Sequence, residues 1–214
     1  MAAVPIAGED GTTPERAARG SHGHVVDELD RARAREYALL ATLLARGPGA
    51  ELIGRLASLQ GDATPLGRAH AALAEAAGRS SEASAAREYF DLFVGLGQGQ
   101  ILPYASQYLS GSLYGRPLME LRETFQLLGI ERVSRSEPED HIATLCETMS
   151  GLIGGAIAGP DGCDRDFFAR HLANWAKRFF VDLERADPAS FYASVGSLGR
   201  TFMEIEAEGY SFPA

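Results

Sequence analysis

The sequence is poor in the features that would stabilise an extracellular domain or span a membrane. It contains only two cysteines, Cys146 and Cys163, so a framework of several disulfides is excluded and a reducing compartment is expected. No apolar run approaches the roughly 18 residues needed to cross a bilayer. The first 23 residues also lack the apolar stretch of about 7 to 15 residues that a secretory signal requires. These absences predict a cytoplasmic protein without stable membrane insertion.

The sequence has fewer basic than acidic residues. The chain has 20 Lys and Arg against 29 Asp and Glu, which gives a formal net charge of −9 at pH 7. Binding to nucleic acid depends on a basic surface that neutralises phosphates, and no basic stripe is visible. The composition therefore excludes a nucleic-acid partner and favours a basic one.

Motifs for catalysis, metal binding and nucleotide binding are also missing. There is no Cys-x-x-Cys, no H-E-x-x-H, no paired Glu-x-x-His and no G-x-S-x-G elbow. Gly95, Gly97 and Gly99 have the wrong spacing for G-x-G-x-x-G and follow a predicted helix instead of a strand. Asp140 beside His141 is explained without acid–base chemistry. We therefore predict a protein that is not an enzyme and that has no metal site and no cofactor.

Hydrophobic periodicity predicts an all-α protein. Residues 1–23 show no sustained period and are predicted to form a flexible tail, whereas residues 24–214 form one helical domain. Apolar residues at helical spacing, bounded by Gly, Pro and capping residues, predict a single bundle of seven or eight helices. The predicted helices cover residues 25–44, 52–59, 65–77, 81–94, 117–128, 136–156, 164–183 and 188–205.

Two connections between predicted helices contain residues with a specific structural or binding role. Pro103 and Tyr104 stand in an apolar loop after the glycine-rich stretch, and such a loop serves either packing or binding of a partner's apolar segment. Ser136 and Glu139 fit an S-x-x-E capping box, which predicts that a helix begins there. In that case Asp140 follows the cap, on the first turn of the helix.

Four separated motifs follow one another along the chain. They are Glu88-Tyr89-Phe90-x-Leu92-Phe93, Leu102-Pro103-Tyr104-x-Ser106-x-Tyr108, Glu137-Pro138-Glu139-Asp140-His141, and Phe168-x-x-His171-Leu172-x-x-Trp175. Together these motifs resemble the TorD/DmsD/NarJ family of redox-enzyme maturation chaperones. The third motif is the most specific, and the resemblance extends in order from about Leu29 to Ile205. One departure is Tyr104, where the family often has Trp.

The resemblance implies an all-helical chaperone that binds the twin-arginine signal peptide, or the body, of an apo molybdenum oxidoreductase. Formate dehydrogenases and DMSO/TMAO reductases are the client types it suggests, with export delayed until the cofactor is inserted. A twin-arginine signal pairs two guanidinium groups with an apolar stretch, so its receptor needs carboxylates beside a hydrophobic groove. The predicted client-binding residues are Glu137, Glu139, Asp140 and His141 on the polar side, and Leu92, Phe93, Pro103, Tyr104 and Tyr108 on the apolar side.

A second function stays open. A helical protein of this kind is alternatively a small-ligand binder that takes a guanine nucleotide or the molybdenum cofactor and acts in cofactor insertion. In that case His141 and the glycines between Gly95 and Gly99 are the site. The sequence contains no loop from which nucleotide binding can be argued.

Overall fold

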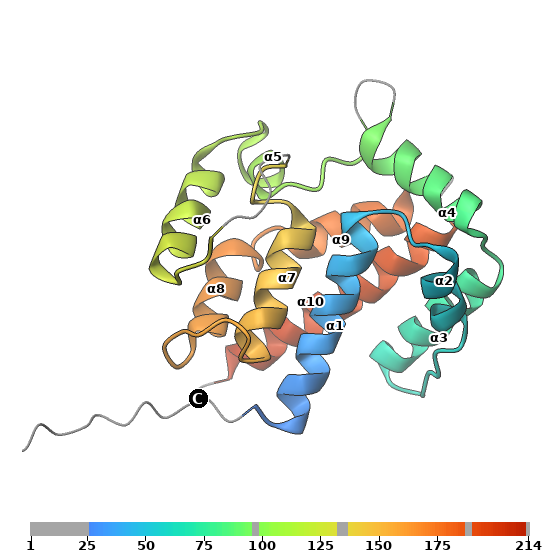
Figure 1. Ribbon diagram of the computed structural model, residues 1–214, viewed down its shortest axis with the longest axis horizontal. Helices are drawn as coiled ribbons and strands as arrows, with labels where there is room; N and C mark the ends of the chain where they lie inside the picture. The colour runs from blue at the N-terminus through green and yellow to red at the C-terminus, as the bar shows by residue number, and fades with distance from the viewer. Residues whose placement is uncertain (1–25, 96–98, 132–136, 187–189, 213–214) are drawn as a thin grey trace, which may run out of the picture.

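The computed structural model describes residues 26–95, 99–131, 137–186 and 190–212, and in these ranges the protein is helical without named strands (Figure 1). The predicted tail, residues 1–23, lies outside the described residues. No helix of the described part is both long and apolar enough to cross a bilayer. The helices are α1 (Glu28–Ala45), α2 (Ala50–Ala57), α3 (Pro65–Gly78), α4 (Glu82–Tyr89), the π-helical segment η1 (Phe90–Val94), α5 (Ala105–Ser110), α6 (Arg116–Leu127), α7 (Ile142–Ile153), α8 (Cys163–His171), α9 (Ala176–Arg185) and α10 (Phe191–Ser211).

Helices α1 and α7 pack side by side and form the centre of the molecule (Figure 1). The long helix α10 packs against α9 and α3 behind this pair. Helices α2, α3 and α4 lie on one side of the pair, and α5, α6 and α8 lie on the other. Residues far apart in the sequence therefore meet between α1 and α7.

The all-α prediction is confirmed, but the predicted number of helices is wrong. The described residues form ten α-helices, because α5 lies inside the connection after Pro103 and because the helix predicted over residues 164–183 is two helices, α8 and α9. The helix is interrupted by a turn from Leu172 to Trp175, and the side chains of both residues are buried. A tight turn that buries its apolar residues keeps nearly the same spacing as a helix, so periodicity does not reveal the break.

Local contacts mark the ends of several helices. The Thr64 hydroxyl accepts from the amide of Gly67 at 3.0 Å, and Pro65 occupies the first turn of α3. Ser81 caps α4. Gly129 adopts a φ of 66° just beyond α6 and so ends that helix in the left-handed conformation that glycine tolerates.

Large aromatic side chains fill the core between the helix pairs. Tyr37 on α1 meets Phe202 on α10 edge to face, with ring centroids 4.8 Å apart. The Trp175 indole donates to the carbonyl of His171 at 2.7 Å. His171 is buried, and its Nε2 lies 2.9 Å from the Thr124 hydroxyl.

The start of α10 is capped from a different helix. The Glu88 carboxylate on α4 accepts from the amides of Phe191 and Tyr192 at 3.0 and 3.2 Å. It also accepts from the Ser190 amide at 3.1 Å and from its hydroxyl at 2.8 Å. A carboxylate at this place satisfies amides that lack partners within the helix and complements the positive end of the helix dipole. Glu88 thus joins α4 to α10.

We expect Glu88→Gln to lower the free energy of unfolding by about 1 to 2 kcal/mol, because an amide carries no charge and only one acceptor oxygen. Urea unfolding followed by circular dichroism measures the change. The matched control is Glu75→Gln, which breaks an exposed ion pair with Arg79 and should cost less than about 0.5 kcal/mol. Equal effects of the two replacements would show that the cap contributes no more than a surface charge.

Candidate functional site

The Pro103-Tyr104 loop and the Glu137–His141 element are brought together by backbone hydrogen bonds. Tyr104 and His141 form an isolated antiparallel bridge. The amide of Ile142 donates to the Pro103 carbonyl at 2.8 Å, and the amide of Ala105 donates to the Asp140 carbonyl at 2.9 Å. We call these bonds, together with the Asp140 side chain, the clamp. It connects the start of α5 to the start of α7.

Asp140 completes the clamp from the interior. Its side chain is fully buried, and its Oδ2 accepts from the amide of Ser106 at 2.7 Å, which caps α5. A carboxylate that accepts from a backbone amide in a buried position makes a charge-assisted hydrogen bond. The prediction that Asp140 presents its charge to a client is therefore not supported by its position, since no solvent reaches it.

The predicted capping box is wrong. Helix α7 begins at Ile142 with His141 as its N-cap, so Glu139 and Asp140 precede the helix instead of forming its first turn. Ser136 lies outside the described residues. Glu139 accepts from Nε and Nη2 of Arg122 on α6, at 3.1 and 2.9 Å. The backbone pairing with Pro103, a long-range contact, overrides the local capping pattern.

His141 is buried, and its imidazole is neutral near pH 7. Its Nδ1 accepts from the amide of Ala143 at 3.1 Å, so the ring proton of the neutral form is assigned to Nε2. Burial lowers the pKa of His141 to about 4, against the opposing charges of Glu137 and Asp140. The ring stands edge to face with Tyr104, with centroids 5.1 Å apart. The Nε2–H group has no partner among the described residues.

A groove of about 910 Å³ opens beside the clamp, between α1 and α7. Its floor consists mainly of small side chains, which allow close approach of another chain. Glu137 and Glu147 supply exposed carboxylates, and Arg46 stands on the α1 side. Its lining residues are Ala38, Ala41, Thr42, Ala45, Arg46, Tyr89, Glu137, His141, Ala143, Thr144, Glu147 and Ser150.

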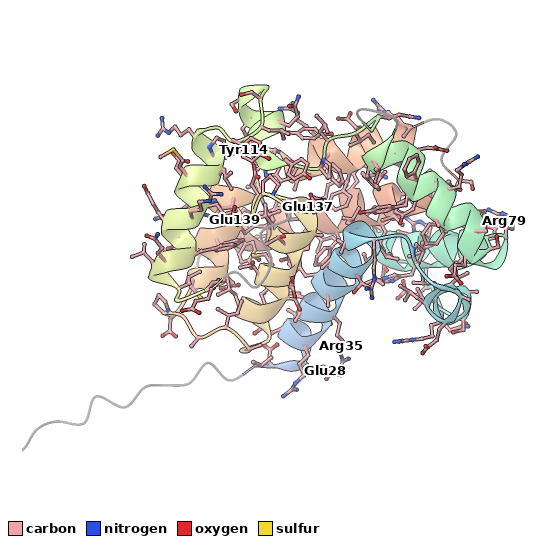
Figure 2. All side chains as sticks on the ribbon, turned by 45° about the horizontal axis from the view of Figure 1, so that its top comes forward. Glu28, Arg35, Arg79, Tyr114, Glu137 and Glu139 are labelled. Carbon is pink, nitrogen blue, oxygen red and sulfur yellow. The ribbon has the colours of Figure 1, made fainter. Side chains whose placement is uncertain are left out.

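Only two of the predicted client-binding residues, Glu137 and His141, line this groove. Tyr104 lies at its edge, where the phenol donates to the Glu137 carboxylate. Figure 2 shows Glu137 and Glu139 at the same end of the molecule, over α6 and α7.

The remaining predicted residues serve the interior or another surface. Leu92 and Pro103 are buried. The Phe93 ring packs against Tyr192, with centroids 5.6 Å apart. Tyr108 donates to Asp182 at 2.9 Å and lines a separate cavity of about 560 Å³.

The α1 side of the groove was missed by the sequence analysis. Ala38, Ala41 and Ala45 recur at helical spacing, and this pattern was the available signal. Tyr89 belongs to one of the four motifs but was not among the predicted client-binding residues. Its phenol donates to the Ala45 carbonyl at 3.0 Å and holds α4 against the end of α1.

The described residues contain no group of three or more His, Cys, Asp or Glu side chains placed to hold a metal ion. Leu96, Gly97 and Gln98, the middle of the glycine-rich stretch, lie outside the described residues. The nucleotide alternative is therefore neither supported nor excluded by geometry.

Comparison with known proteins identifies relatives. A family model described as the nitrate reductase delta subunit matches residues 59–181, more than half of the chain. This stretch contains the clamp and α7 but not α1. Proteins named chaperone protein TorD from Aliivibrio salmonicida and Aliivibrio fischeri are 28% and 29% identical to this chain. Each match covers 56% of the chain and 61% of the relative, so the chain spans less than two thirds of these relatives.

More distant matches extend over more of the chain. A protein of the same name from Colwellia psychrerythraea is 22% identical, with 86% of this chain and 93% of that protein covered. A solved structure described as a redox enzyme maturation protein from Archaeoglobus fulgidus matches with a TM-score of 0.53 at 22% identity. It covers 80% of this chain and 93% of that one. The structural likeness shows a shared fold.

Replacing the clamp carboxylate should destabilise the protein. We expect Asp140→Asn to lower the free energy of unfolding by about 1.5 to 3 kcal/mol, because it removes a buried charge-assisted hydrogen bond to Ser106. Urea unfolding measures the loss, with the exposed Asp161→Asn as the matched control. If Asp140→Asn leaves stability unchanged and only weakens client binding, Asp140 is a binding residue as the sequence predicted.

The two buried histidines predict acid sensitivity. Burial lowers the pKa of both His141 and His171 from the usual 6.5 to about 4. Below pH 6.5 the unfolded chain takes up protons that the folded protein does not, so stability is present above this pH and falls as the pH drops toward 4. His171→Gln should reduce the slope of unfolding free energy between pH 6.5 and 4.5, measured by urea unfolding at each pH. An unchanged slope would show that His171 titrates normally.

Proposed function

Because this chain belongs to the nitrate reductase delta subunit family, we propose that it is a maturation chaperone for a molybdenum oxidoreductase and binds its client in the groove between α1 and α7. The proposed client segment is the twin-arginine signal peptide of the apoenzyme. Holding it in the cytoplasm would delay export until the cofactor is inserted and the enzyme is folded. Relatives named as chaperones support this proposal.

The observation that carries the proposal is the combination of charge and small side chains in one groove. Glu137 and Glu147 present exposed carboxylates, and carboxylates pair with guanidinium groups. The alanines of α1 form an apolar wall beside them, which fits the apolar stretch after the arginines. The net charge of −9 favours the approach of a basic segment.

His141 adds a directional contact. Its Nε2–H group suits a backbone carbonyl of a bound segment, because the ring is neutral and already uses Nδ1 to cap α7. Its position against Tyr104 is set by the clamp. Binding by this residue needs no proton transfer, so the proposed role is that of a chaperone and includes no catalytic step.

Calorimetric titration with a synthetic peptide tests the proposal. The peptide carries two adjacent arginines followed by an apolar stretch, and a parallel titration uses guanine nucleotide. We expect peptide binding in which replacement of the apolar residues by Ser costs more affinity than replacement of both arginines by Lys, because buried side chains contribute about 1.5 to 3 kcal/mol each. Nucleotide binding without peptide binding would instead support the small-ligand alternative.

Two replacements of His141 separate its roles. Asn retains an acceptor for the cap, but its shorter amide does not extend to the position of Nε2. We therefore expect His141→Asn to preserve the melting temperature and to lower peptide affinity about 2- to 10-fold, the value of one hydrogen bond. His141→Ala also removes the cap and should lower the melting temperature. If both variants bind the peptide like the wild type, His141 acts only as a cap.

A further inference from the structure

Tyr114 adopts a backbone conformation that tyrosine rarely takes. Its φ is 63°, and it is the one non-glycine residue with positive φ among the described residues. It stands in the turn between α5 and α6, next to Gly115, the N-cap of α6. The left-handed conformation brings the Cβ of an L-residue close to its own backbone, so it is strained in every residue except glycine. Residues held in such strained conformations cluster at functional sites.

Packing does not explain the strain. The Tyr114 side chain is 68% exposed. Within the described part of the chain, it makes no hydrogen bond and no ring contact. A glycine at this position would relieve the backbone with little loss of buried area, so the fold itself does not explain why tyrosine is present.

Tyr114 lies close to the polar edge of the groove. Figure 2 labels Tyr114 and Glu137 in the same part of the molecule, and Tyr104, which donates to Glu137, interacts electrostatically with both. The pKa of Tyr104 is raised by burial, by its hydrogen bond to Glu137 and, in smaller measure, by the Tyr114 phenol, which places the two phenols in the same neighbourhood. An exposed aromatic ring in the neighbourhood of an exposed carboxylate suits a guanidinium group, because that group can stack on the ring face while it donates to the carboxylate.

We propose that Tyr114 is a specificity residue of the groove, and that its ring stacks on an arginine of the bound peptide while Glu137 pairs with the same guanidinium. This inference rests on the proposed function and adds to it a preference for arginine over lysine. An ammonium group carries the same charge but has no flat face to stack, so it gains less from the ring. Glu137 alone would attract both cations.

The experiment compares Tyr114→Gly with Tyr114→Phe, using the same peptide with two arginines and its double-lysine analogue. Tyr114→Gly relieves the backbone and removes the ring, so its melting temperature should rise while its affinity for the arginine peptide falls several-fold. Its preference for arginine over lysine should largely disappear. Tyr114→Phe keeps the ring and should keep both affinity and preference. Met119→Ala, an exposed apolar side chain on α6, is the control and should bind like the wild type.

The outcomes separate this inference from the function on which it rests. If the wild-type protein binds neither peptide, the proposed function and the role of Tyr114 both fail. If the wild type binds and Tyr114→Gly keeps full affinity and the preference for arginine, only the role of Tyr114 is overturned. A lower melting temperature for Tyr114→Gly would also overturn it, because the ring would then stabilise the fold.

Discussion

The buried contact between Asp140 and the amide of Ser106 is the interaction on which the candidate site depends. With the backbone bridge between Tyr104 and His141, it joins α5 to the start of α7. Glu139 extends the connection to α6 through Arg122. A short charged element thus positions three helices, and Glu137 and His141 reach the groove because their neighbours are held inside.

The parts of the fold that depend on neighbouring residues could be predicted from the sequence. Pro65 lies in the first turn of α3 and Gly129 lies just beyond α6, so each marks a helix end through its own backbone preference. The start of α7 could not be predicted in this way. Ser136 and Glu139 satisfy the pattern of a capping box, but the pairing of Ile142 with Pro103, 39 residues earlier in the sequence, decides where the helix begins.

The residues predicted to bind a client are divided between the groove and the interior. Glu137 and His141 line the groove, whereas Asp140 acts in the interior. A charged residue in a motif has the same appearance in the sequence whether it faces solvent or caps a distant helix. The alanines of α1 were not predicted to line a groove, because small apolar residues at helical spacing are also typical of helices that pack in the core.

Photocrosslinking from two positions tests most directly whether the client segment lies in the groove. A photoreactive benzoylphenylalanine is placed at Thr42 on the α1 side of the groove or at Leu127, an exposed residue of α6 outside it. Each protein is irradiated with the peptide that carries two arginines and an apolar stretch. The account predicts a crosslinked product from position 42 and little or none from position 127. Equal products from both positions, or a product from position 127 alone, would contradict it.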